Sequence, residues 1–217
     1  MSVNTLDAVT EPVETRAQRK ERTRQALLDR TLDLLADRSF ASVSLREVAR
    51  AAGIVPTAFY RHFASMDELG VVLAEDSMRV LRRMLRDARR TPSTKNATAS
   101  LDILVRQVRA HEAEFRFIAR ERYGGVTEVR RAIATELRLF VSELTIDLSR
   151  MPGLADWDVE DLEMAADLIV QAMLAAVIDL LEVERPGSAD ERAVIERAEK
   201  QLRLIMLGIG SWKPTRA

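Results

Sequence analysis

Apolar residues recur every three or four positions along most of the chain, the spacing that places side chains on one face of an α-helix. Several hydroxyl residues stand three positions before a Glu or a Gln, as in a capping box at the start of a helix: Thr15, Ser44, Ser65 and Ser188. No segment between turn signals alternates apolar and polar residues as a half-buried strand would. The pattern therefore predicts an all-α fold of about nine helices.

Turn signals divide this pattern into separate helices. The ends are marked by Gly53, Gly124-Gly125, Pro152-Gly153, Pro186-Gly187 and Gly208. The expected helices cover about residues 16–37, 45–52, 56–63, 66–90, 101–122, 126–150, 159–182 and 190–207. The polar stretch TPSTKNATAS, residues 91–100, marks a domain boundary. We thus expect a disordered arm (1–15), a small helical head (16–64), a connecting helix (65–90), a larger helical body (91–210) and a tail (211–217).

The head contains the stretch GIVPTAFYRHF, residues 53–63, which is rich in rings for a chain that is 5% aromatic. A short helix, a turn with Gly and a second short helix, packed on a preceding long helix, form a helix-turn-helix. On a helical period Phe59 and Phe63 lie one turn apart, and we expect both in the core. Tyr60 and His62 carry polar ends that can reach a phosphate oxygen. The opposite side of this helix presents Thr57, Ala58 and Arg61.

The stretch SLREVARAAGIVPTAFYRHFASMDELG resembles the helix-turn-helix signature of the TetR family of bacterial transcriptional repressors. Its second half is similar to the branch that controls unsaturated fatty acid synthesis, the FabR/DesT type. The resemblance covers about residues 16–90 and continues more weakly through FRFIARERYGGVTEVRRAIATEL. Met66 departs from the pattern, because the family often has a Lys there. The resemblance implies that the chain binds double-stranded DNA at a palindromic operator.

The resemblance also assigns roles to residues of the head. Ser44 would cap the second helix and touch the DNA backbone, with Arg46 close to the groove. The start of the recognition helix would lie near base edges, and two residues at its end would clamp phosphates: Pro56, Thr57 and Ala58 for the bases, Tyr60 and His62 for the phosphates.

The body is expected to form a homodimer and to hold an effector. Its last two helices are apolar around more than one face, which predicts neighbours on two sides, one of them a second copy of the chain. The expected dimer contacts are Leu168, Val177, Ile178, Val194, Ile195, Leu202 and Ile205. The resemblance implies a long-chain fatty acyl thioester as effector, on coenzyme A or acyl carrier protein. The apolar residues available for that pocket are Leu104, Val108, Phe115, Ile118, Phe140, Leu144 and Met173.

Charge is unevenly distributed, although the formal net charge is only −1. Residues 16–24 are strongly basic, whereas residues 151–199 are strongly acidic. The basic run would attract phosphate, but such runs also occur as ordinary solvated helix faces.

Composition excludes several other classes of protein. The chain has no Cys, so disulfides and thiolate chemistry are excluded. The first residues do not resemble a signal peptide, and the apolar run 168–181 is too short for a membrane span, so we expect a cytoplasmic protein. His62 and His111 fall in different expected domains, and neither belongs to a metal or catalytic motif, so we expect no enzyme, metal or cofactor. Two alternatives stay open: a TetR-like repressor that senses another hydrophobic molecule, and a helical ligand-binding module without DNA affinity.

Overall fold

The computed structural model describes residues 15–90 and 97–212, and these residues form helices without a strand. The all-α prediction is therefore confirmed. Most of the expected arm (1–14), part of the expected linker (91–96) and most of the expected tail (213–217) lie outside the described residues. The helices are α1 (Arg16–Leu34), α2 (Leu45–Ala51), α3 (Pro56–Phe59), α4 (Met66–Arg90), α5 (Ala97–Ala110), α6 (Glu112–Glu121), α7 (Thr127–Ser149), α8 (Val159–Leu181) and α9 (Ala189–Ser211), with a short 3₁₀ turn, η1 (Phe40–Ser42).

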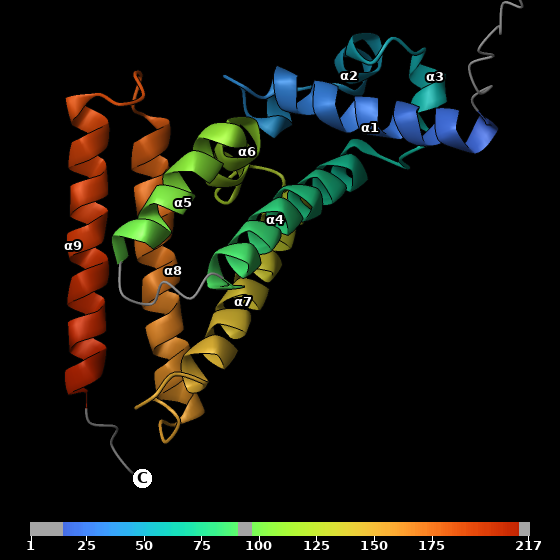
Figure 1. Ribbon diagram of the computed structural model, residues 1–217. Coiled ribbons are helices and arrows are strands. Elements are labelled where there is room, and N and C mark those ends of the chain that lie inside the picture. Colours follow the sequence, from blue (N-terminus) through green and yellow to red (C-terminus); the bar gives the residue numbers. More distant parts are fainter. Residues whose placement is uncertain (1–14, 91–96, 213–217) are drawn as a thin grey trace, which may run out of the picture.

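Three helices form a head at one end of the molecule, and the others form the body (Figure 1). Helices α2 and α3 pack on α1, and α4 runs from the head into the body alongside α7. Helix α8 packs between α7 and α9, while α5 contacts both α8 and α9. Helix α6 touches α1 of the head as well as α4, α7 and α8 of the body. It therefore lies at the junction of the two parts.

Each predicted capping residue begins a helix in the structure. Thr15 and Ser44 form complete capping boxes. In each, the hydroxyl accepts from the backbone amide three residues later, and the side chain of that later residue accepts from the backbone amide of the capping residue. Ser65 and Ser188 accept from the amides of Glu68 and Glu191, but those carboxylates bond the amides of Ala64 and Gly187, one residue earlier. The local signal thus marks the helix starts correctly.

Three predicted helix boundaries in the body are wrong. Helix α5 begins at Ala97 rather than at about residue 101. The single helix expected over 101–122 is divided at His111, whose backbone leaves the helical region with φ −132° and ψ 39°. Its ring Nδ1 lies 3.4 Å from Glu114 Oε1, so this His belongs to the start of α6. At the other end, α9 continues through Gly208 to Ser211, because tertiary packing outweighs the cost of a Gly within a helix.

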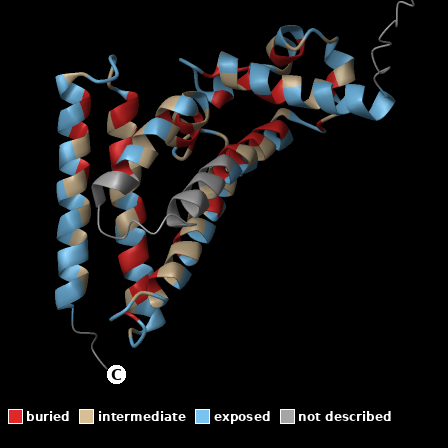
Figure 2. Ribbon diagram, viewed as in Figure 1, coloured by how far each residue is buried: buried red, intermediate tan, exposed pale blue. Residues whose placement is uncertain are grey.

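One hydrophobic core extends from the head into the body. Leu27, Phe59 and Leu69 of the head side are fully buried in the same cluster as Phe117 and Ile133 of the body. In Figure 2 buried positions recur along the part of α4 nearest the head. The head is therefore packed against the body rather than tethered to it.

Gly70 on α4 allows the closest approach in this junction. A Cβ atom there would meet the Phe40 ring of η1 and Cγ2 of Val129 on α7, each at 2.6 Å. Only a residue without a side chain fits between these groups.

Helix α8 is long and apolar enough, by length and composition, to cross a membrane. In the structure it packs against both α7 and α9, and Leu162, Ala166 and Leu180 on it are buried. Its place between two helices accounts for the buried part of its apolar composition, whereas Met164 and Leu168 on it are exposed.

Candidate nucleic-acid interface

The turn between α2 and α3 has the geometry of a helix-turn-helix. Gly53 follows α2 with φ +70°, a left-handed conformation that favours Gly. Val55 is the N-cap of α3, and Pro56 occupies the first turn, where its missing amide hydrogen is harmless. The expected helix over 56–63 is corrected here, because α3 ends at Phe59 and residues 60–62 form turns. These turns are held by the amides of His62 and Phe63, which both donate to the Phe59 carbonyl at 2.9 and 3.2 Å.

The rings of this segment divide between core and surface as predicted. Phe59 and Phe63 are buried, and their ring centroids lie 5.8 Å apart. Tyr60 is 63% exposed and packs edge-on against Phe59. Its hydroxyl-bearing ring therefore stands on a rigid support and projects outwards.

The remaining predicted contacts are exposed with one exception. Ser44, Arg46, Pro56 and Thr57 are exposed, whereas Ala58 is half-buried. Sequence reasoning missed Val55, which is 64% exposed at the start of α3. The sequence signal that could have indicated Val55 was an apolar residue between the Gly of the turn and the start of the recognition helix. An exposed apolar side chain at this place can contact a thymine methyl group.

His62 is less accessible than predicted. Its Nδ1 atom is buried and has no hydrogen-bond partner among the described residues. Burial lowers the pKa of the ring below its ordinary value of 6.5, and the nearby charges of Lys20, Arg24 and Arg61 lower it further, against a small opposite effect of Glu21. Protonation of His62 is thus disfavoured in the free protein, because the ring is partly buried and lies close to the positive charges of Lys20, Arg24 and Arg61.

The basic run of α1 lies beside the recognition segment. Arg16, Arg19, Lys20 and Arg22 are exposed. Arg24 instead stacks over the Phe63 ring, with its guanidinium carbon 4.6 Å from the ring centroid. The run therefore supplies positive charge next to α3 and also fixes α1 to the core of the head.

The N-terminus of α2 is held by the carboxylate of Glu47. Glu47 accepts from the Ser44 amide at 2.9 Å and from Arg38 Nη1 at 3.0 Å. The Ser44 amide, followed by Arg38, lowers the pKa of this carboxyl from 4.5 to about 2. Ser44 is therefore confirmed as a cap, and its position is fixed from both sides.

The predicted effector residues do not form one cluster. Val108 and Phe115 belong to a cluster between α5, α6, α8 and α9, and Leu104 joins it to a neighbouring cluster that includes Met173. Ile118 instead belongs to the core shared with the head, while Phe140 and Leu144 pack between α7 and α8. Helices α5, α6 and α8 therefore bring four of the seven residues into neighbouring positions.

The predicted dimer contacts need correction. Val177 and Val194 are buried inside the protomer, 4% and 7% exposed, because they pack with Val108 and Phe115. Leu168 is 52% exposed, as expected for a contact. Ile178, Ile195, Leu202 and Ile205 are half-buried. The large apolar side chains that α8 and α9 expose are Val159, Met164, Leu168, Leu204, Met206 and Leu207.

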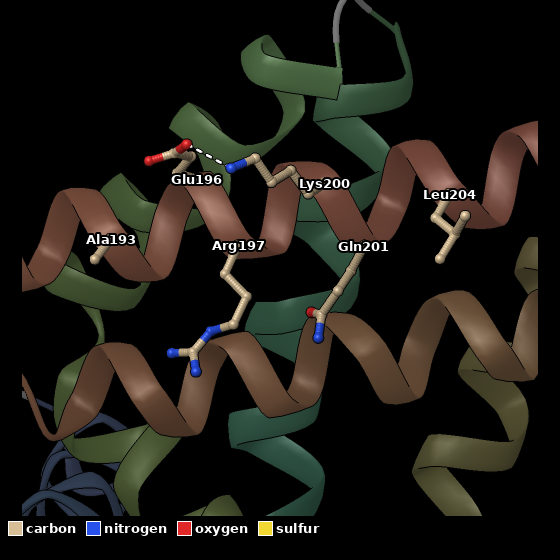
Figure 3. A pocket seen from close by; sticks show the side chains of 6 residues that line it. All are labelled: Ala193, Glu196, Arg197, Lys200, Gln201 and Leu204. Atoms are coloured by element: carbon tan, nitrogen blue, oxygen red, sulfur yellow. Dashed lines mark hydrogen bonds and ion pairs between the residues drawn. The ribbon is translucent and has the colours of Figure 1, made fainter.

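A hollow of about 430 Å³ runs along one face of α9 (Figure 3). Its lining is Ala193, Glu196, Arg197, Lys200, Gln201 and Leu204. Lys200 Nζ lies 2.6 Å from Glu196 Oε1, and Arg197 pairs with Asp179 of α8 at 3.0 Å. None of the predicted effector residues lines this hollow, so it is not the pocket expected for an acyl effector.

Comparison with known proteins identifies the family. Residues 27–70 match the model described as bacterial regulatory proteins, tetR family. Residues 93–208, more than half of the chain, match the model described as tetracyclin repressor-like, C-terminal domain. The chain belongs to the TetR family of DNA-binding transcriptional regulators, which are generally non-enzymatic.

Solved structures share the whole architecture at low sequence identity. A transcriptional regulator from Rhodococcus sp. Rha1 is 17% identical with a TM-score of 0.64, over 88% of this chain and 99% of the other. A TetR-family regulator from Streptomyces coelicolor gives the same identity and TM-score, over 88% and 97%. The fatty acid degradation regulator FadR from Bacillus halodurans is 14% identical with a TM-score of 0.59, over 83% and 94%. These similarities confirm the fold.

Proposed function

We propose that this protein is a homodimeric repressor that binds a palindromic operator through α3 and releases or retains it in response to a hydrophobic effector. The observation that carries the DNA-binding part is the outer face of α3. Thr57 and Tyr60 are exposed on a segment whose other face is fixed by the buried rings of Phe59 and Phe63. The basic residues of α1 lie beside it, where they can contact phosphates.

The dimer follows from apolar surface that the protomer does not bury. Leu168 on α8 and Leu204 and Leu207 on α9 are each more than half exposed. Exposed large apolar side chains of this kind favour association, and closed two-fold symmetry is the commonest solution. A two-fold dimer requires half-sites about 10 base pairs apart, or a multiple of that distance.

For the effector, we propose a long-chain fatty acyl thioester, on coenzyme A or acyl carrier protein, that contacts the apolar clusters between α5, α6 and α8. The class of ligand rests on the resemblance of the recognition segment to the FabR/DesT type. The place rests on Leu104, Val108, Phe115 and Met173, which lie in adjoining clusters there. Sites between facing helices are common in helical bundles.

The same fold also serves other ligands. One structural neighbour is the fatty acid degradation regulator FadR, and another is the multidrug binding protein EbrR, solved with imidazole. The second candidate is therefore a repressor that senses a different hydrophobic small molecule. A role on chromosomal DNA also implies a cytoplasmic location, which stays a prediction.

The first experiment selects DNA from a random duplex pool with the full-length protein and measures the affinity of the selected sequence by gel shift. We expect a palindrome. Failure to enrich any sequence would favour the helical ligand-binding module without DNA affinity.

A second titration adds palmitoyl-CoA or oleoyl-CoA to the complex, with coenzyme A and palmitate as matched controls. We expect either thioester, but not coenzyme A alone, to change operator affinity. No change and no binding to the free protein would exclude the acyl thioester and leave the second candidate.

A further inference from the structure

The last turn of α6 is joined to the end of α1 by a single arginine. Arg120 Nη1 donates to the carbonyl oxygens of Leu35 at 2.8 Å and Arg38 at 2.6 Å, and its Nη2 donates to Ala36 at 3.2 Å. These carbonyls follow the C-terminus of α1, where unpaired acceptors and the helix dipole favour a cation. A residue of the body therefore caps a helix of the head.

The next residue of α6 makes the complementary contact. Glu121 is 1% exposed, and its Oε1 accepts from the backbone amide of Phe40 at 2.9 Å. Phe40 begins η1, the turn that leads into α2. Glu121 Oε2 is also buried but has no hydrogen-bond partner among the described residues, and a Cβ on Gly124 would lie only 2.1 Å from it. Through its bond to the Phe40 amide, Glu121 fixes the start of η1 from the side of the body.

A continuous polar path leads from these contacts to the helix-turn-helix. Arg38, whose carbonyl is held by Arg120, donates through Nη2 to the Ser42 carbonyl at 2.6 Å and through Nη1 to Glu47. Glu47 in turn fixes the Ser44 cap of α2. Body, η1 and α2 are thus connected through directional hydrogen bonds.

Helix α6 also extends into the body at its other end. Arg116 donates to the Leu181 carbonyl at the end of α8 at 2.6 Å, and Phe115 belongs to the cluster between α5, α6, α8 and α9. A helix of this length covers about 15 Å, so a shift at its body end is passed rigidly to Arg120 and Glu121.

We propose that Arg120 and Glu121 are positioning residues for operator binding: they form a latch that sets the angle of the head on the body. This inference rests on the proposed DNA-binding function. The shared apolar core holds head and body together but permits small rotations, whereas hydrogen bonds to several backbone groups fix direction. Opening the latch would leave each recognition helix intact and change the distance between the two recognition helices of a dimer.

The test compares Arg120→Gln with Arg109→Gln, a matched change whose hydrogen bonds to Glu191 join α5 to α9 within the body and take no part in the contacts of α6 with the head. Each protein is titrated against the selected operator, against one with an extra base pair between its half-sites, and against one with a substitution inside a half-site. We expect Arg120→Gln to reduce the discrimination against the extra base pair about tenfold, the usual order of coupling between sites. Discrimination against the half-site substitution should match that of the wild-type protein, and Arg109→Gln should match the wild-type protein on all three duplexes.

Hydrogen exchange of the free protein gives a readout that needs no DNA. In Arg120→Gln and in Glu121→Gln the amides of residues 36–42 should exchange faster, while α2 and α3 keep their protection. Unchanged exchange, or unchanged spacer discrimination, would overturn the latch. Loss of half-site preference together with loss of protection across α2 and α3 would also overturn it, since the residues would then only stabilise the head. If the wild-type protein selects no DNA sequence, the proposed function fails, while the exchange result still decides whether the contacts open.

Discussion

Gly70→Ala should destabilise the protein, although Ala is ordinarily the better helix former. In an exposed helix this change gains up to about 1 kcal/mol. At Gly70 the new methyl would lie 2.6 Å from the Phe40 ring and from Cγ2 of Val129, and all of these groups are buried. Overpacking of this kind costs about 1 to 3 kcal/mol, and two contacts at 2.6 Å with buried groups favour the upper part of that range. After the helix gain is subtracted, we expect a net loss of about 1 to 2 kcal/mol.

Urea unfolding followed by circular dichroism measures this loss, with Gly125→Ala as the matched control. A Cβ on Gly125 meets only Ala41 Cβ, at 3.8 Å, so the control should be neutral or slightly stabilised. Combining Gly70→Ala with Val129→Ala removes one of the overlapping atoms, so the double variant should lose less stability than the sum of the single changes. A Gly70→Ala protein as stable as wild type, or strictly additive effects, would refute the close packing of head, α4 and α7.

Four further changes test the head. Tyr60→Phe should weaken binding to selected and unselected DNA alike by about 1 to 3 kcal/mol, measured by gel shift, because it deletes a hydrogen bond to a charged group. Thr57→Ala should instead alter base preference by about 1 to 3 kcal/mol in a repeated selection. A phosphate beside His62 would raise its pKa, so operator affinity should increase as pH falls below 6.5, and His62→Gln should reduce that increase. The pKa of Glu47 is lowered by folding, so its contribution to stability is present above pH 4.5 and lost as pH falls towards 2; acid unfolding of Glu47→Gln should lack this component.

Local signals predicted most of the fold, because helix starts depend on nearby side chains. Thr15 and Ser44 begin helices through contacts within three residues, which a sequence shows directly. The break at His111 has no Gly or Pro beside it. Both α5 and α6 contact α4 and α8, but α5 also packs on α9 whereas α6 also packs on α1 and α7. Tertiary packing of this kind overrides helix propensity.

The recognition segment was predictable for the same reason, whereas the contacts of the body were not. Helical period placed Phe59 and Tyr60 on the correct sides of α3. The excess of apolar residues on α8 predicted that the helix has neighbours on two sides. The helical period does not say whether Val177 faces its own protomer or a second copy, and in the structure it faces the interior of its own protomer. The contact between Glu121 and Phe40 joins residues 81 positions apart, and no local pattern indicates it.

The salt dependence of binding to the selected operator tests the central claim most directly. The full-length protein is titrated with this duplex and with a scrambled duplex at several salt concentrations. We predict that both dissociation constants rise steeply with salt, with a logarithmic slope of about 0.9 per phosphate contact. At each salt concentration the selected duplex should bind about 10³-fold more tightly or better. Binding that is independent of salt and equal for the two duplexes would contradict the assignment of the α3 face as a DNA-reading surface.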